Sequence, residues 1–193
     1  LCACFIVPVA QAKWIAFDRA GAAVRPGMKA AGSAERFTVD ISIPGIELNQ
    51  EGDFSLLSIP GHVLSREKNA PELPVMTTSI LLPDKGAVEA RIIAFEETTL
   101  EVGTIAPARG KVLRNVDLST VPRVKGDMYE QDAFFPAADY KVELAEPYIC
   151  RDVRGAALRI HPVRYNPVTG QAKILKSATI EVGITNDAGT NEK

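Results

Sequence analysis

Apolar and polar residues alternate in short runs along most of this chain. The clearest run lies near the end, where every second residue is aliphatic or alanine: Ala178, Ile180, Val182 and Ile184. A period of two is typical of a β-strand with one buried face, because successive side chains point to opposite sides of a sheet. No window sustains the longer period of an amphipathic helix over a typical helix length. The pattern therefore predicts an all-β protein.

The segments that carry this strand pattern are punctuated by Pro and Gly. They are residues 37–43, 54–59, 76–82, 87–95, 99–105, 140–149, 156–165 and 171–184. Many short strands separated by turn residues favour a sandwich of two sheets. We expect residues 35–184 to form one antiparallel β-sandwich, jelly-roll-like and with little helix.

A cluster of turn-forming residues separates the last two predicted strands. Pro167 fixes one backbone φ angle, Asn166 tolerates a left-handed conformation, and Gly170 adopts positive φ without steric cost. This cluster predicts a β-hairpin between residues 156–165 and 171–184.

The first twelve residues form an apolar run, LCACFIVPVAQA, which ends in a small-x-small triplet. This ending is typical of a signal peptidase site, so we expect residues 1–12 to be a signal peptide remnant cleaved between Ala12 and Lys13. Such a leader indicates export, to the medium or the cell surface. Two alternatives are a buried N-terminal strand and a lipoprotein signal acylated at Cys4.

Two segments lack a strand or helix pattern. Residues 13–34 mix Ala, Gly and Pro, which interrupt every possible helix early, and we expect a flexible leader there. Residues 185–193 are polar and aperiodic, which predicts a linker toward a downstream domain.

The charge balance argues against nucleic acid as a partner. Lys and Arg total 22 against 24 Asp and Glu, and the basic residues are interspersed along the chain, which gives no basic stripe for a phosphate backbone. Beyond the leader, no apolar run approaches the ~18 residues that span a bilayer, so we expect no membrane contact after signal removal. Cleavage would also leave Cys150 as the only cysteine, without an intrachain disulfide partner.

The residues that support catalysis are few. Cys150 with His161 or His62 would be the only thiol–imidazole pairs. Cys150, however, lies in the apolar register of a predicted strand, which indicates a buried structural cysteine. Two histidines without clustered carboxylates argue against a metal site. We therefore expect no catalytic residues, no metal and no cofactor in this chain.

Five sequence blocks, taken in order, resemble one family. They are PELP at 71–74, IAPARG at 105–110, FFP at 134–136, RDVRG at 151–155 and PVRYNPVTG at 162–170. In order and spacing the chain is similar, over roughly residues 50 to 184, to the N-terminal prodomain of gingipain-type cysteine proteases.

This resemblance implies a function. Such a prodomain precedes a secreted cysteine protease domain, keeps the zymogen latent until it is cut away, and assists folding during export by type IX secretion. The implied partner is the downstream protease domain of the same precursor, which favours Arg or Lys before the cut bond.

The resemblance also implies where inhibition would occur. The family offers a basic residue to the specificity pocket from a loop just after the block at 105–110, and position in that block points to Arg114. Arg109 and Lys111 belong to the same loop, which could instead be a solvated basic loop. The alternative function is a non-catalytic secreted β-sandwich that binds a surface partner or a glycan. Six aromatic residues could line a glycan-binding face or pack in the core and sheets: Tyr129, Phe134, Phe135, Tyr140, Tyr148 and Tyr165.

Overall fold

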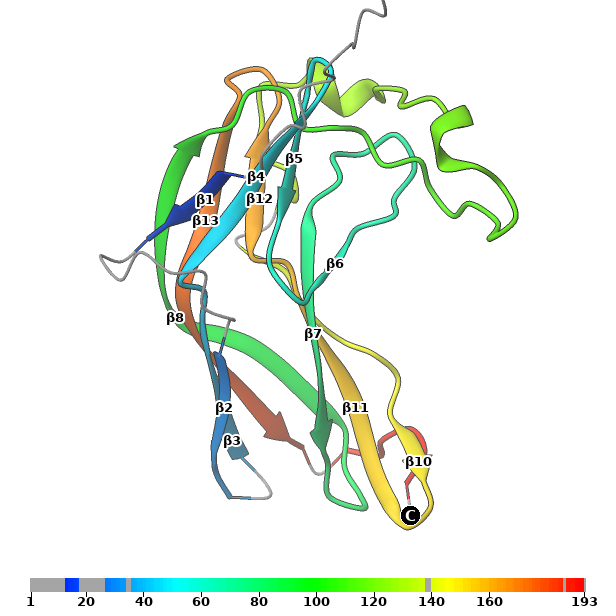
Figure 1. Cartoon of the computed structure of the whole chain (residues 1–193). Helices are drawn as coiled ribbons and strands as arrows, with labels where there is room; N and C mark the ends of the chain where they lie inside the picture. Colours follow the sequence, from blue (N-terminus) through cyan, green and yellow to red (C-terminus); the bar gives the residue numbers. More distant parts are fainter. Residues whose placement is uncertain (1–12, 18–26, 34–35, 138–139, 186, 193) are drawn as a thin grey trace, which may run out of the picture.

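The chain folds into two five-stranded sheets and a smaller three-stranded sheet at one end (Figure 1). The computed structural model describes residues 13–17, 27–33, 36–137, 140–185 and 187–192. All pairs of strands are antiparallel: the first large sheet has the order β12-β13-β3-β2, with β8 also on β13, and the second has the order β10-β11-β7-β6, with β9 also on β11. The small sheet has the order β1-β4-β5.

The strands of the first large sheet are β2 (Gly27–Gly32), β3 (Arg36–Ser42), β8 (Val88–Glu101), β12 (Val163–Asn166) and β13 (Gln171–Ile184). Those of the second are β6 (Val63–Leu64), β7 (Pro74–Leu81), β9 (Val142–Leu144), β10 (Tyr148–Cys150) and β11 (Val153–Ile160). The small sheet contains β1 (Lys13–Ala16), β4 (Gly45–Glu51) and β5 (Phe54–Ser58). The described residues include no α-helix, only the 3-10 turns η1 (Leu118–Thr120) and η2 (Asp127–Glu130), so the all-β prediction is confirmed. They also contain no helix long and apolar enough to cross a membrane.

Strand β13 organises the first sheet, because it pairs with β8 along its whole length and with two strands in succession on its other edge. Residues 171–174 pair with β12, and residues 177–183 pair with β3. Between them, Leu175 N donates to Pro162 O at 2.9 Å, and Ile43 N donates to Lys176 O at 2.7 Å. Where the partner of β13 changes from β12 to β3, residues just outside those two strands thus supply the hydrogen bonds. The backbone of β13 is therefore paired at Leu175 and Lys176 as well.

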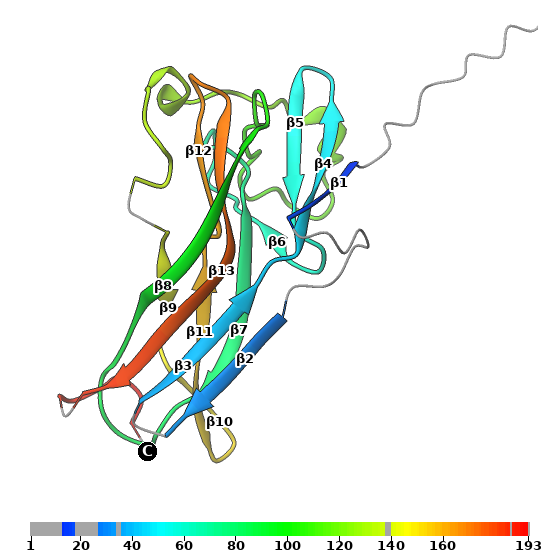
Figure 2. The ribbon, with the colours of Figure 1, turned by 90° about the vertical axis from the view of Figure 1, so that its left-hand side faces the viewer.

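The two large sheets enclose one apolar core. Figure 2 shows β13, β3 and β2 in front of β11 and β7. The buried side chains of these strands belong to one cluster: Val39, Ile41, Met76, Ile80, Ala156, Leu158, Ile160, Ala178, Ile180 and Val182. On β13 the buried residues from 178 to 182 alternate with less buried ones, as the sequence pattern predicts.

The predicted hairpin forms between β12 and β13, and the turn uses the predicted residues. Asn166 Oδ1 accepts hydrogen bonds from Val168 N at 3.0 Å and Thr169 N at 3.3 Å, and Gly170 has φ of 68°. The first predicted arm is wrong in one respect, because residues 156–165 are two strands in different sheets. The chain crosses from β11 to β12 at His161 and Pro162, and Pro162, which has no N–H, cannot continue the ladder of β11.

Other strand boundaries differ from the prediction. Residues 87–105 were expected to hold two strands, but β8 is continuous across the polar stretch at 96–99, since it pairs with β13 throughout. Residues 140–149 were expected to hold one strand but contain β9 and the start of β10, which both pair with β11. Strand β4 was not predicted.

The expected flexible leader is wrong for two of its segments. Lys13–Ala16 is strand β1 on β4, and Gly27–Gly32 is strand β2 on β3. Ala and Gly, which make up most of β2, have low strand propensity, so this strand depends on the neighbouring backbone of β3 that pairs with it. Of the two residues at the predicted cleavage site, Lys13 is the first residue of β1. Ala12 and the rest of 1–12 lie outside the described residues.

Cys150 was expected to be buried, and this is wrong. It is exposed at the end of β10, an edge strand whose residues are all exposed. Strand β10 and its partner β11 form a hairpin that extends past the core, as Figure 1 shows. An apolar register predicts burial only where a second layer covers that face.

The segment at 187–192, expected to be part of a linker, is bound to the end of the sandwich. Ala87 N donates to Asp187 O at 2.9 Å, and Asn191 Nδ2 donates to Pro147 O. Arg154, 1% exposed, reaches three backbone carbonyls: Pro83 O at 3.0 Å, Gly86 O at 3.0 Å and Thr190 O at 2.8 Å. A buried arginine thus joins this segment to the loop between β7 and β8.

Replacing Ile180, which is 0% exposed, with alanine should reduce the free energy of unfolding by about 2–5 kcal/mol, because it leaves a cavity between the sheets. The control is Ile93→Ala on β8, where the side chain is 51% exposed and little change is expected. Urea denaturation of both variants measures the difference. Equal losses would show that the core is not where the structure places it.

Arg154→Met should reduce the free energy of unfolding by about 3 kcal/mol, since three carbonyls lose a charged donor inside the protein. Arg159→Met, on the exposed face of the same strand, is the matched control and should be nearly neutral. Hydrogen exchange should also show faster exchange at 187–192 in the first variant alone. Unchanged exchange there would contradict the role given to Arg154.

Candidate functional site

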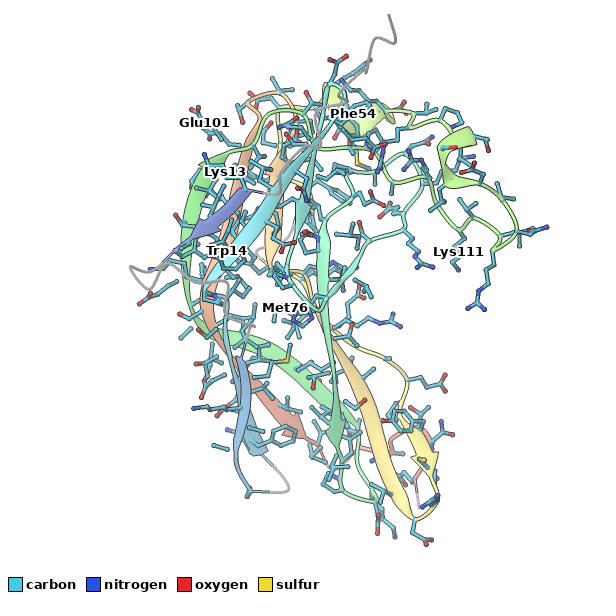
Figure 3. The ribbon with its side chains drawn as sticks, viewed as in Figure 1. Lys13, Trp14, Phe54, Met76, Glu101 and Lys111 are labelled. Carbon is cyan, nitrogen blue, oxygen red and sulfur yellow. The ribbon has the colours of Figure 1, made fainter. Side chains whose placement is uncertain are left out.

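A long loop projects from the sandwich between residues 110 and 122 (Figures 1 and 3). The segment just before it is fixed in the core, with Ile105 and Ala106 0% exposed. Ala106 N donates to Ser55 O at 2.9 Å, and Glu72 N donates to Ala106 O at 2.9 Å. The block at 105–110 is therefore a firm base from which the loop leaves the domain.

Tyrosine side chains strengthen this base. Tyr165, 0% exposed, donates from its hydroxyl to Gly103 O at 2.9 Å and accepts from Ile105 N at 3.2 Å. Tyr129 donates to Ile105 O at 2.8 Å. Burial raises the pKa of both phenols, so both remain neutral donors at physiological pH.

Beyond the base, the loop is open to solvent. Within the described residues, no hydrogen bond or ion pair engages the exposed side chains of Lys111 or Arg114. Figure 3 shows Lys111 on this projecting segment. Large apolar side chains accompany them, since Leu113 is 73% exposed and Leu118 is 56% exposed. The tip thus combines free cations with uncovered hydrophobic surface.

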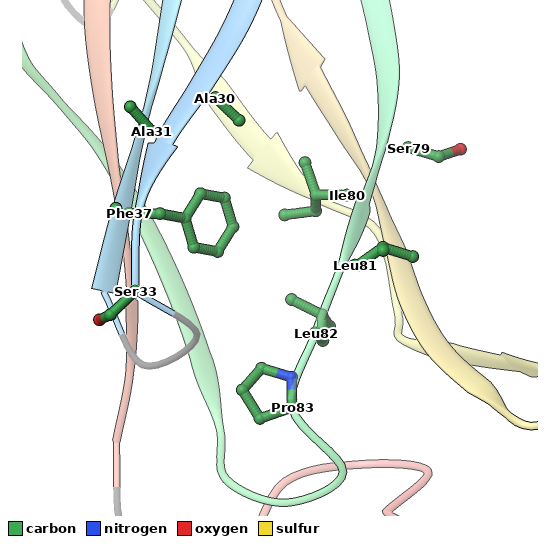
Figure 4. A pocket seen from close by; sticks show the side chains of 10 residues that line it. Ala30, Ala31, Ser33, Phe37, Ser79, Ile80, Leu81, Leu82 and Pro83 are labelled. Atoms are coloured by element: carbon green, nitrogen blue, oxygen red, sulfur yellow. The ribbon is translucent and has the colours of Figure 1, made fainter.

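A groove of about 510 Å³ separates the loop from β6. Its lining includes Val63 and Leu64 on one side and Leu113, Arg114 and Val116 on the other. A second groove of about 530 Å³ lies between the β2–β3 hairpin and β7, and the side chains around it are uncharged (Figure 4). Of these two grooves, the first joins apolar surface to an exposed cation that has no ion-pair partner among the described residues, which favours the loop as the candidate site.

Arg109 lies at the base of the loop and is bound on two sides. Its Nε donates to Val121 O at 2.8 Å, and its Nη2 donates to Glu51 Oε1 at 2.9 Å. Its side chain is only 18% exposed. The three predicted loop residues thus differ: Arg114 and Lys111 are free in solvent, and Arg109 is part of the scaffold.

Arg123, which sequence reasoning missed, completes the base. Its side chain, 8% exposed, pairs with Glu51 Oε2 at 3.0 Å and Glu72 Oε2 at 2.8 Å. Hydrogen bonding to Arg123, and then to Arg109, holds the pKa of Glu51 below its ordinary value despite partial burial. Burial opposes the charged form of Arg123, but its two carboxylate partners outweigh this and raise its pKa. No sequence signal joins residues 51, 72 and 123, because only the fold brings them together.

The possible nucleophile Cys150 and the possible base His161 lie far apart. Cys150 pairs with Val153 at the start of β11, and His161 follows the far end of that eight-residue strand. At ~3.3 Å per residue, the strand separates them by roughly 25 Å. His161 instead has Nε2 at 3.8 Å from Glu143, and burial lowers its pKa. Within the described ranges, no three His, Cys, Asp or Glu side chains could hold a metal ion.

The aromatic residues considered for glycan binding are mostly part of the core. Tyr140 and Tyr165 are buried, and Tyr129 and Phe135 are partly buried against the core cluster. Tyr148 is 42% exposed on β10, at the other end of the sandwich from the loop. These side chains therefore do not share one exposed face.

Comparison with known proteins gives one family. Residues 37–193 match the family model described as Propeptide_C25. Gingipain R1 of Porphyromonas gingivalis is 34% identical over 125 residues, which is 65% of this chain and 12% of that relative. Lys-gingipain of the same species is 28% identical over 160 residues, which is 78% of this chain and 9% of the relative. The chain thus spans about an eighth or less of the length of these curated relatives.

Two solved structures share the fold. One is a complex of the pro- and mature domains of RgpB from Porphyromonas gingivalis, with a TM-score of 0.79 and 24% identity over 86% of this chain and 89% of that chain. The other concerns the zymogenic latency of gingipain K from that species, with a TM-score of 0.74 and 26% identity over 92% of this chain and 100% of that chain.

Glu51→Gln should destabilise the protein by about 1 kcal/mol at pH 7, a small value because the carboxylate is 44% exposed. The pKa of Glu51 is lowered by folding, so its contribution is present above the ordinary glutamate pKa of about 4.3 and is lost as pH falls through the folded value. The two proteins should therefore become equally stable in acid, as urea denaturation across this range would show. Glu101→Gln, an exposed carboxylate on β8, is the control. A difference that persists in acid would contradict the ionic role.

Proposed function

Since this chain belongs to the Propeptide_C25 family of gingipain propeptides, we propose that it holds a gingipain-type cysteine protease latent until proteolysis removes it. The partner is the protease domain of the same precursor. Latency is supported by the two structural relatives, one a complex with a mature domain and the other described by its zymogenic latency.

The observation that carries the mechanism is the unpaired Arg114 among exposed apolar residues. Leu113 and Leu118 are costly to leave in water, and a partner surface would cover them. A guanidinium in a carboxylate-lined pocket gains charge-assisted hydrogen bonds of roughly 1.5–3 kcal/mol. Arg114 fills the specificity pocket, and the apolar residues beside it bury against the rim.

Arg114 is preferred over the other two basic residues of the loop. Arg109 would have to break its contacts with Glu51 and Val121 to reach a pocket. Lys111 is exposed but lies nearer the base of the loop, next to Gly110 and Val112. Arg114 is flanked by Leu113 and lies at the apolar tip, where a partner would bury the most surface.

Such an inhibitor does not need a very tight interface. A covalent linker between prodomain and protease supplies an effective concentration on the order of millimolar. An interface of about micromolar affinity would then be almost fully occupied, and cutting the linker followed by dilution would release the enzyme. We further propose that the domain assists folding of its protease during export by type IX secretion, to the medium or the cell surface. The leader-like residues 1–12 support the export, and the family resemblance implies the folding role and the route.

Arg114→Ala should raise the inhibition constant of the purified domain against its own protease by about 10- to 100-fold, which corresponds to the loss of the charged contacts. Competition against an Arg- or Lys-containing peptide substrate measures this constant. Lys111→Ala is the matched control and should change it little. Inhibition that is unaffected by Arg114→Ala would remove this residue from the mechanism, and weakening by Lys111→Ala instead would move the contact to Lys111.

A further inference from the structure

The loop is closed by two reciprocal contacts between its limbs. Arg109, on the outgoing limb, donates from Nε to Val121 O at 2.8 Å on the returning limb. Arg123, on the returning limb, donates from Nη1 to Pro107 O at 2.8 Å on the outgoing limb. Each limb therefore holds the backbone of the other.

Glu51 joins the two arginines. Its Oε1 accepts from Arg109 Nη2 at 2.9 Å, and its Oε2 accepts from Arg123 Nη2 at 3.0 Å. Glu51 is the last residue of β4, so the carboxylate is fixed to a sheet. Glu72 gives Arg123 a second anchor at 2.8 Å, from a segment whose backbone is hydrogen-bonded to Ala106. The base of the loop is thereby tied to the scaffold at two points.

Beyond this base, the hydrogen bonds that the loop makes with the described residues are all local. Val116 N donates to Leu113 O at 3.1 Å, and Thr120 N donates to Asp117 O at 3.1 Å. These are single turns, which open and close readily when the ends of the loop are free. The conformation around Arg114 thus depends on the contacts at the base.

An exposed loop with two basic residues is ordinarily a substrate for a protease that cuts after Arg or Lys. Cleavage of folded proteins requires a locally opened segment, and its rate follows the population of that open form when opening is fast. Contacts that keep the loop closed therefore separate an inhibitor from a substrate.

We propose that Glu51, Arg109 and Arg123 are positioning residues that hold the loop at 110–122 closed, so that Arg114 occupies the protease pocket while the Arg114–Asn115 bond resists hydrolysis. The clamp formed by these three residues deepens the proposed function and rests on it. Loss of the clamp leaves Arg114 accessible but lets the protease add water across the bond that follows it.

The first test uses trypsin, which cuts after Arg and Lys and does not depend on the proposed partner. Glu51→Gln removes the negative charge and replaces one of the two acceptor oxygens with an NH2 group, so the short contacts to Arg109 Nη2 and Arg123 Nη2 cannot both be kept. Cleavage after Lys111 or Arg114 should therefore be faster by about tenfold or more. Mass spectrometry of early products locates the cut. Glu181→Gln is the matched control, because its carboxylate also pairs with two arginines, Arg36 at 3.7 Å and Arg91 at 2.7 Å, on the first large sheet.

A conservative variant separates the clamp from simple packing. Gln keeps the shape of Glu51 and loses the charge, whereas Asp keeps the charge and loses one methylene. The clamp predicts slower loop cleavage in Glu51→Asp than in Glu51→Gln, and a packing role predicts the reverse order. Equal cleavage rates for Glu51→Gln and the native domain would overturn the clamp.

The protease partner supplies the second test. Mixed with it, Glu51→Gln should inhibit at first and then lose inhibition as the Arg114–Asn115 bond is cut, while the native domain and Glu181→Gln should stay intact several-fold longer. Equal lifetimes would overturn the clamp. Failure of the pocket assignment gives a different result, since Arg114→Ala would then leave inhibition unchanged whatever the trypsin rates of the Glu51 variants.

Discussion

Backbone pairing along β13 is the constraint on which the rest of the molecule depends. One edge of this strand pairs with β8 over its full length, and the other pairs first with β12 and then with β3. The same strand contributes buried side chains to the core from Ala172 to Val182. Strand β11 of the second sheet leads directly into β12, which pairs with β13 in the first sheet. The position of β13 therefore restricts where β11 can lie, so the two sheets cannot shift independently.

The loop at 110–122 has a base that is hydrogen-bonded to the sheets and a tip that is exposed to solvent. Tyr165 of β12 holds the backbone at Gly103 and Ile105, and Glu51 of β4 holds the two arginines at the base of the loop. Beyond them, Leu113 and Arg114 lie in solvent. A segment held in one conformation loses less entropy on binding than a flexible one, so the scaffold favours recognition at the tip.

Local patterns predicted the parts of this structure that short stretches of chain decide. The alternation in β13 and the turn from Asn166 to Gly170 follow from periodicity and turn chemistry, and both are present. Sequence patterns gave wrong predictions where burial or strand formation depends on another segment of the chain. Cys150 has an apolar register but no covering layer, and Gly27–Gly32 has weak strand propensity but pairs with β3. At the candidate site, the family resemblance implies the loop and its basic residues, whereas no sequence pattern indicates the contacts of Arg123.

The sequence by itself determined that the chain is all-β, where its last hairpin turns, and which family it resembles. These properties depend on neighbouring residues or on ordered blocks, and both can be read along the chain. Only the tertiary structure decided that Arg109 is part of the scaffold while Arg114 is free, because Glu51 lies 58 residues from Arg109 and 72 from Arg123 in sequence. Ion pairs between such distant residues exist only after the sheets have formed, since the strands set which side chains meet.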